Sequence, residues 1–156
     1  MKRALAFGLV SAQFLLLAAL ILIPHGSLWP VNTVVIAASI ALGVAGAILA
    51  VLGVTGLGPA LTVSPIPREH AQLVTSGVYG LVRNPIYTGL MTGGLGFALF
   101  GASVWHIAAW VALALLLSAK TRWEERMLVA EHPDYAGYGA RVGRFVPGVG
   151  RLRPPI

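Results

Sequence analysis

The chain has 156 residues, of which 57% are hydrophobic and only 10% are charged, and its formal net charge at pH 7 is +6. A soluble domain carries about 25% charged residues, so this composition excludes an ordinary soluble domain and indicates one membrane domain over residues 1–156. The absence of cysteine excludes a disulfide framework and a cysteine zinc site, and we expect no metal site. The positive charges flank apolar runs, which favours a membrane surface over nucleic acid as their partner.

Two apolar runs open the chain, over residues 4–23 and 31–53. Each supplies the roughly 20 apolar residues that a transmembrane helix needs, so residues 1–53 predict an N-terminal transmembrane hairpin. A signal peptide is the alternative for the first run, because Lys2 and Arg3 precede it. The run is longer than the about 7–15 apolar residues of a signal peptide and no clear cleavage site follows it, so we favour a retained helix.

Residues 54–86 form a segment that is rich in glycine and proline and also carries many apolar side chains. Loops longer than about 12–15 residues are usually either functional or disordered, and this one is too apolar for free disorder. We therefore expect it to pack on the membrane face of the helices and to form a wall of a site.

The next uncharged stretch would be about 52 Å long as a single helix from Pro85 to Ala119, which is too long for one crossing. A break at residues 101–103 divides it into a hairpin of two short spans. Four spans place both termini and the central loop on one face, and these segments hold every lysine and arginine. By the positive-inside rule that face is cytoplasmic. The sequence thus predicts an all-α, polytopic membrane protein with about four transmembrane helices, cytoplasmic termini and a cytoplasmic C-terminal helical segment.

Gly89 and Gly93 form a GxxxG pair in the third predicted span. Small residues at this spacing let two helix backbones approach closely. The pair therefore indicates either packing within one chain, which we favour, or a homodimer through Gly89 and Gly93.

The tripeptide Arg83-Asn84-Pro85 predicts a helix start, because asparagine is a strong N-cap and proline is favoured at the first helical position. Such a start presents free N–H donors, and Arg83 adds a forked cation, so the spot suits a carboxylate or phosphate. An ordinary capped helix is the alternative. Tyr79 and Tyr87 flank the cap, either as site residues or as anchors at the membrane interface.

Charged residues follow the fourth predicted span, and Lys120 with Glu124 and Arg122 with Glu125 have the spacing of helical ion pairs. A solvated helix end is one interpretation of this pattern. Two adjacent carboxylates so near the apolar boundary are costly unless paired, so Glu124 and Glu125 are also site candidates.

Several motifs occur together and in order. Residues 73–79 read Leu-Val-Thr-Ser-Gly-Val-Tyr, residues 82–89 read Val-Arg-Asn-Pro-Ile-Tyr-Thr-Gly, and Glu124-Glu125, Tyr135, Tyr138, Arg141, Arg144 and Pro147 follow. This set resembles the isoprenylcysteine carboxyl methyltransferase family, which is grouped with the phospholipid methyltransferases and whose signature is Arg-His-Pro-x-Tyr-x-Gly followed by Glu-Glu. The resemblance covers roughly residues 55–150.

The resemblance implies a membrane enzyme that uses S-adenosylmethionine, with residues 54–156 as its cofactor-binding catalytic region. It implies catalytic roles for Arg83, Glu125 and Lys120, the last of which stands where related enzymes hold a substrate carboxylate. The cofactor contacts that it implies are Gln72, Leu73, Val74, Tyr79, Asn84, Pro85, Tyr87 and Glu124.

One departure from the signature bears on the reaction, because Asn84 replaces its histidine. Asparagine cannot carry a proton near neutral pH, whereas methyl transfer to an acceptor that already holds a lone pair needs no base. We expect a methyltransferase acting on a lipophilic substrate, most like a carboxyl O-methyltransferase of the isoprenylcysteine type. A phospholipid or aminolipid N-methyltransferase and a non-catalytic membrane scaffold are the alternatives.

Overall fold

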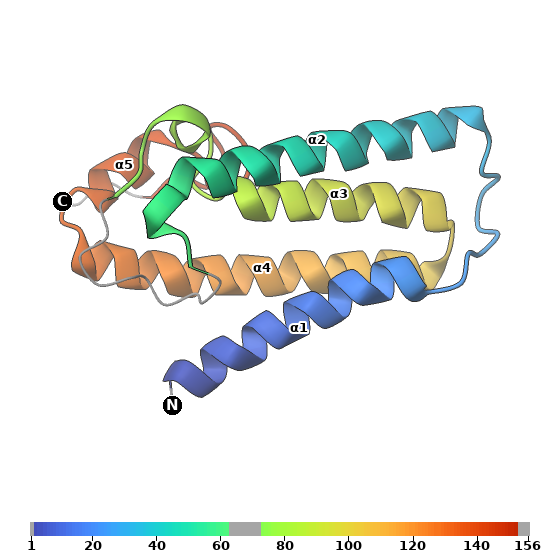
Figure 1. The fold of residues 1–156 in the computed structure, drawn as a ribbon, viewed down its shortest axis with the longest axis horizontal. Helices are drawn as coiled ribbons and strands as arrows, with labels where there is room; N and C mark the ends of the chain where they lie inside the picture. The colour runs from blue at the N-terminus through green and yellow to red at the C-terminus, as the bar shows by residue number, and fades with distance from the viewer. Residues whose placement is uncertain (1, 63–72, 153–156) are drawn as a thin grey trace.

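The computed structural model describes residues 2–62 and 73–152, and it is all-helical apart from one isolated β-bridge. The helices are α1 (Lys2–Leu22), α2 (Thr33–Leu57), α3 (Pro85–Gly101), α4 (Val104–Glu131) and α5 (Tyr135–Arg141), with short 3₁₀ turns η1 (Gly58–Ala60) and η2 (Gly77–Gly80). The four long helices run alternately in opposite directions, so the start of α1, η2 and α5 lie at one end of the bundle (Figure 1). The predicted all-α class is confirmed for the described residues.

Three of the four long helices, α1, α2 and α4, are long and apolar enough to cross a membrane. The 17-residue α3 spans about 26 Å, which is less than the roughly 30 Å of a bilayer core, so its crossing stays a prediction. The break at residues 101–103 is confirmed, because Ala102 has the left-handed φ of 45° and Ser103 caps α4 through its side chain. The fourth predicted span is the first part of a longer helix, since α4 has 28 residues and continues through the charged run.

A stripe of small residues lets α2 and α3 pack with their backbones in close contact. On α2 the stripe consists of Ser39, Gly43, Gly46, Ala50 and Gly53. A Cβ atom at Gly89 would lie 2.5 Å from the carbonyl oxygen of Gly46, and one at Gly46 would lie 2.5 Å from the backbone nitrogen of Gly93. The Gly89–Gly93 pair therefore packs helices within one chain, and the homodimer stays untested.

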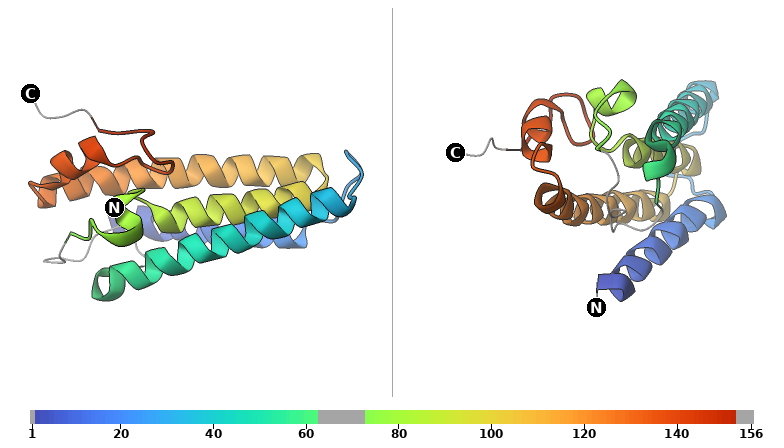
Figure 2. Two further views of the ribbon diagram at one scale, coloured as in Figure 1. Left: turned by 90° about the horizontal axis from the view of Figure 1, so that it is seen from above. Right: turned by 60° about the vertical axis from the view of Figure 1, so that its left-hand side comes forward.

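The first helix packs against α4 and α3, with α3 between it and α2, so residues 1–53 do not form a closely packed hairpin. The N-terminal half of α1 diverges from the other helices (Figures 1 and 2). Its other end joins the core, where Leu20 packs with Leu113 and Leu117 of α4. At this end Gly26 N donates to Gly101 O over 2.8 Å and Trp29 Nε1 donates to Leu99 O over 2.9 Å.

An apolar groove of about 280 Å³ lies between the C-terminal half of α1 and α2, with α3 as its floor. We call it the α1/α2 groove. It is lined by Leu17, Leu20 and Ile21 of α1, by Gly46, Ala47 and Ala50 of α2, and by Gly89, Leu90, Gly93, Gly94 and Phe97 of α3.

Candidate functional site

The chain after α4 folds back across the start of α3 and is joined to it by backbone hydrogen bonds. Arg83 N donates to Gly143 O over 2.8 Å and Asn84 N donates to Arg144 O over 3.1 Å, beside a parallel bridge between Val82 and Gly143. These bonds attach the C-terminal segment, residues 132–152, to the residues that precede α3.

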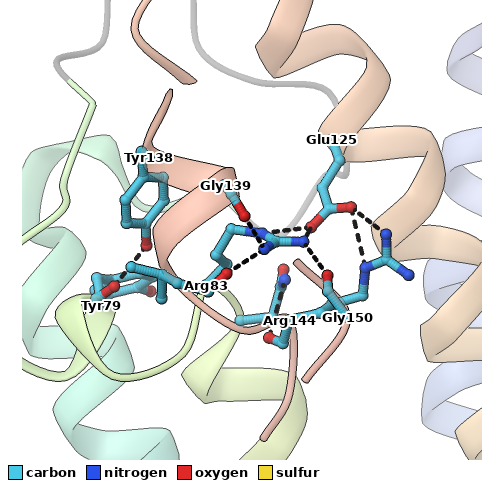
Figure 3. Close-up of polar contacts among 9 residues, drawn as sticks. Tyr79, Arg83, Glu125, Tyr138, Gly139, Arg144 and Gly150 are labelled. Carbon is cyan, nitrogen blue, oxygen red and sulfur yellow. Dashed lines mark hydrogen bonds and ion pairs between the residues drawn. The ribbon is translucent and has the colours of Figure 1, made fainter. Parts of the chain in front are cut away.

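The Arg83 side chain lies at the centre of this junction, completely buried (Figure 3). Its Nη1 donates to the carbonyls of Gly139 and Val142, and its Nη2 donates to that of Gly150. Its Nε donates to Glu125 Oε1 over 2.8 Å, and Nη2 lies 2.7 Å from the same oxygen. All five guanidinium N–H groups therefore have an acceptor inside the protein.

Glu125 is held from two sides, because Arg144 donates to its second oxygen through Nε at 3.0 Å and Nη2 at 2.7 Å (Figure 3). Both ion pairs found among the described residues involve Glu125. The predicted helical pairs Lys120–Glu124 and Arg122–Glu125 are not formed, since Arg83 and Arg144 reach Glu125 from other segments. With every guanidinium donor of Arg83 and both oxygens of Glu125 engaged, these side chains hold the C-terminal segment against the start of α3, and the catalytic roles expected for them from sequence stay predictions.

A second polar group, which we call the Tyr87 cluster, lies between α1, α3 and α4. The Tyr87 hydroxyl donates to Glu124 Oε1 over 2.6 Å. The Lys120 ammonium stands 4.9 Å from the centroid of the Tyr87 ring and donates to Gln13 Oε1 over 2.9 Å. Lys120 is only 2% exposed, so these contacts stabilise a buried cation.

Gln13 is a member of this cluster that the sequence analysis missed. It is buried in α1 and brings that helix to Lys120. Its only sequence signal is a lone amide inside a long apolar run, where a polar side chain needs a partner.

The adjacent acids Glu124 and Glu125 face different parts of the molecule because successive helical residues are turned by about 100°. Glu124 shares its face of α4 with Lys120 and turns toward Tyr87. Glu125 shares a different face with Arg122 and Arg126, beneath the C-terminal segment.

Most of the residues predicted to contact the cofactor lie in the described part of the structure. Asn84 takes the N-cap position of α3 but makes no side-chain capping bond; instead its Nδ2 approaches Arg144 O at 3.4 Å. Pro85 is the first residue of α3 and is buried, as is Tyr79. Leu73 and Val74 are half-buried, and Gln72 lies outside the described residues.

Tyrosine hydroxyls hold the corner between η2, α2 and α5. Tyr79 donates to Gly53 O over 3.1 Å, and Tyr138 donates to Tyr79 O over 2.6 Å. Burial raises the pKa of Tyr79 well above its ordinary value, and burial raises the pKa of Tyr138 to about 12. Both phenols therefore remain donors at neutral pH, and Tyr79 is a buried structural residue and not an exposed interfacial anchor.

The histidine, aspartate and glutamate side chains in the described part of the chain form no group of three that could hold a metal ion. The charged residues of the candidate site belong to two groups, the Arg83–Glu125–Arg144 network and the Tyr87 cluster, on different faces of α4.

Comparison with known proteins gives a family match and two relatives. The phospholipid methyltransferase family matches residues 34–135. The cobalt-zinc-cadmium resistance protein CzcN of Cupriavidus metallidurans is 37% identical over 114 residues, which cover 72% of this chain and 50% of CzcN. The nickel-cobalt-cadmium resistance protein NccN of Alcaligenes xylosoxydans xylosoxydans is 32% identical over 134 residues, which cover 85% of this chain and 60% of NccN. The chain thus spans only half to three fifths of these relatives. No solved structure matches it.

Proposed function

Because this integral membrane chain belongs to the phospholipid methyltransferase family, we propose that it is an S-adenosylmethionine-dependent methyltransferase acting on a lipophilic substrate. The acceptor that we propose is a carboxylate, as in the isoprenylcysteine-type O-methyltransferases. The charged segments lie at one end of the bundle, which supports a cytoplasmic location for both termini.

The observation that carries the proposal is that residues lining the α1/α2 groove lie one helical turn from residues of the Tyr87 cluster. Leu17 in the groove lies one turn after Gln13 in α1, and Leu90 in the groove lies one turn after Tyr87 in α3. An apolar tail in the groove would therefore bring the polar head of the same molecule to Lys120. Convergence of an apolar groove on a few placed polar groups is the usual design of a small-molecule site.

Glu124 fits the cofactor, because its Oε1 accepts from Tyr87 while its Oε2 has no hydrogen-bond partner in the described ranges 2–62 and 73–152. A half-buried carboxylate oxygen of this kind would accept a ribose hydroxyl or lie near a sulfonium charge. Leu73, Val74, Tyr79, Asn84, Pro85 and Tyr87 would complete the binding segment, together with Gln72. When bound, S-adenosylmethionine would supply a methyl group on a positively charged sulfur.

Lys120 would orient the acceptor. Its ammonium has three donors, of which one is used by Gln13 and one is available to the Tyr87 ring, so within the described residues one is left for a carboxylate. A carboxylate needs no base, which agrees with asparagine at position 84. The protein then promotes the reaction by aligning the two reactants and by excluding water.

An aminolipid N-methyltransferase is the second candidate, favoured by the description of the matching family. Its ammonium acceptor must lose a proton first, and Asn84 cannot take it. Titration of S-adenosylmethionine and S-adenosylhomocysteine into the detergent-solubilised protein tests both enzymes, with Glu124→Gln expected to weaken binding and the exposed Glu131→Gln to leave it unchanged.

A lack of binding to the wild type would refute both enzymatic functions and leave the scaffold. If the cofactor binds, radiolabelled methyl transfer to a prenylcysteine analogue and to extracted phospholipids separates the two acceptors. Label in the phospholipid alone would refute the carboxylate.

A further inference from the structure

A depression of about 400 Å³ lies on the face of α4 that carries Arg122 and Arg126, away from the Tyr87 cluster. Its lining residues are Arg122, Glu125, Arg126, Val129, Arg144 and Leu152. We propose that this arginine depression binds the phosphate of an anionic lipid headgroup, separately from the site of methyl transfer.

The charge of the depression is strongly unbalanced. Glu125 is its one acid, and both of its oxygens are already shared between Arg83 and Arg144. Arg122, Arg126 and Arg144 line the depression together with this one carboxylate, so its lining carries a net charge of 3 − 1 = +2.

The outer arginines are free to bind a ligand. Arg122 and Arg126 are exposed and make no hydrogen bond or ion pair with any residue in the described ranges. They lie one turn apart on α4, so their forked donors can converge on the oxygens of one phosphate. Arg144 is 20% exposed at its side chain and lies at the edge of the same depression.

The depth of these arginines along α4 favours a lipid as the source of the phosphate. Arg122 lies 18 residues after Val104, or about 27 Å along the helix, and Arg126 lies about 33 Å along it. A bilayer core is about 30 Å thick, so the two side chains are at the level of the headgroups. Val129, which is 44% exposed, gives the depression an apolar wall that an amphiphile would cover.

The depression and the Tyr87 cluster lie on nearly opposite faces of α4. At about 100° per residue, Arg122 and Arg126 are centred roughly 180° from Lys120 and Glu124 around the helix axis. A phosphate bound here would therefore contact the C-terminal segment through Arg144 and would not enter the groove of the proposed substrate.

The test measures lipid binding to the purified protein by native mass spectrometry, with phosphatidylglycerol and phosphatidylcholine offered in turn. We expect phosphatidylglycerol to bind at least about tenfold more tightly, and the double variant Arg122→Gln/Arg126→Gln to lose about tenfold of that affinity. The matched control is Arg3→Gln/Arg141→Gln, which removes the same charge from exposed residues outside the depression and should change the affinity less than about twofold.

Three results would overturn the proposal. Equal affinities for phosphatidylglycerol and phosphatidylcholine would refute a site that selects anionic lipids. Equal losses of phosphatidylglycerol affinity in the two double variants would show only a general attraction between a positively charged surface and negatively charged lipids. Displacement of phosphatidylglycerol by millimolar inorganic phosphate would assign the depression to a free anion and not to a lipid. Circular dichroism checks that both variants keep their helices, as expected for substitutions of exposed side chains.

Discussion

Replacing Glu125 by glutamine removes the negative charge that Arg83 and Arg144 share. Arg83 is fully buried and Arg144 is 20% exposed, so two cations lose their counter-ion, one of them with no access to water. The amide oxygen can still accept from Arg83, but the new NH₂ group faces Arg144 donors that now lie 2.7 and 3.0 Å from an oxygen. Breaking a buried pair from one side costs about 3–5 kcal/mol, and we expect a loss near 3 kcal/mol because one acceptor survives.

The neighbouring Glu124→Gln provides the matched control, since it makes the same chemical change one residue away. Glu124 is half-buried and its one hydrogen bond comes from Tyr87, which can donate to an amide oxygen. We expect it to cost less than about 1 kcal/mol of stability while it weakens cofactor binding. Arg83→Ala should resemble Glu125→Gln and destabilise the fold, because it leaves three carbonyl acceptors of the C-terminal segment unpaired.

Thermal unfolding in detergent, followed by tryptophan fluorescence, measures the difference between the two glutamate variants. Limited trypsin digestion then localises it, since unfolding of the C-terminal segment should speed cleavage after Arg141 and Arg151, whose side chains are already exposed, in Glu125→Gln alone. Identical melting temperatures and identical digestion of the two variants would refute the assignment of Glu125 as the structural acid and Glu124 as the functional one.

Three further predictions address the site, the helix packing and the pH response. Tyr87→Phe should keep the fold and weaken cofactor binding by about tenfold in titration calorimetry, because a hydrogen bond to a charged group contributes about 1.5 kcal/mol; unchanged affinity would exclude Glu124 from the cofactor site. Gly89→Ala should lower the melting temperature, because its Cβ would lie 2.5 Å from a backbone oxygen of α2, whereas Gly93→Ala, with no atom within 4 Å, should be tolerated; equal damage from both would contradict packing within one chain. The folded-state pKa of Tyr138 lies near 12, above the ordinary value of 10, so its contribution to stability is complete below pH 10 and declines between pH 10 and 12; the melting temperature should fall in that window, and less steeply in Tyr138→Phe.

The helical architecture could be predicted from sequence because it follows from local patterns. The break at residues 101–103 and the start of α3 at Pro85 both come from glycine, serine and proline signals. The sequence predicts that the second span ends at Gly53, whereas α2 continues through Gly56 to Leu57. Glycine is tolerated within apolar helices, so it is a weak stop signal there.

The partners of Arg83 could not be predicted from sequence. Three of them are backbone carbonyls that lie 56, 59 and 67 residues away, and a carbonyl is present in every residue and leaves no pattern. The family resemblance implies that Tyr87 and Glu124 both contact the cofactor, but not the hydrogen bond between them. Gln13 joins the cluster because α1 crosses α4 at that level. Its lone amide in an apolar run indicates that it needs a partner but not which residue that partner is.

The dependence of Arg83 on carbonyls at positions 139, 142 and 150 also sets an order for biosynthesis. A ribosome makes the chain from its N-terminus, so α1 to α4 are complete while the guanidinium of Arg83 still lacks these three acceptors. The nascent bundle must keep that side chain hydrated near the translocon exit. Burial of the cation, and with it the closure of this corner, then waits until the residues up to position 150 have been translated.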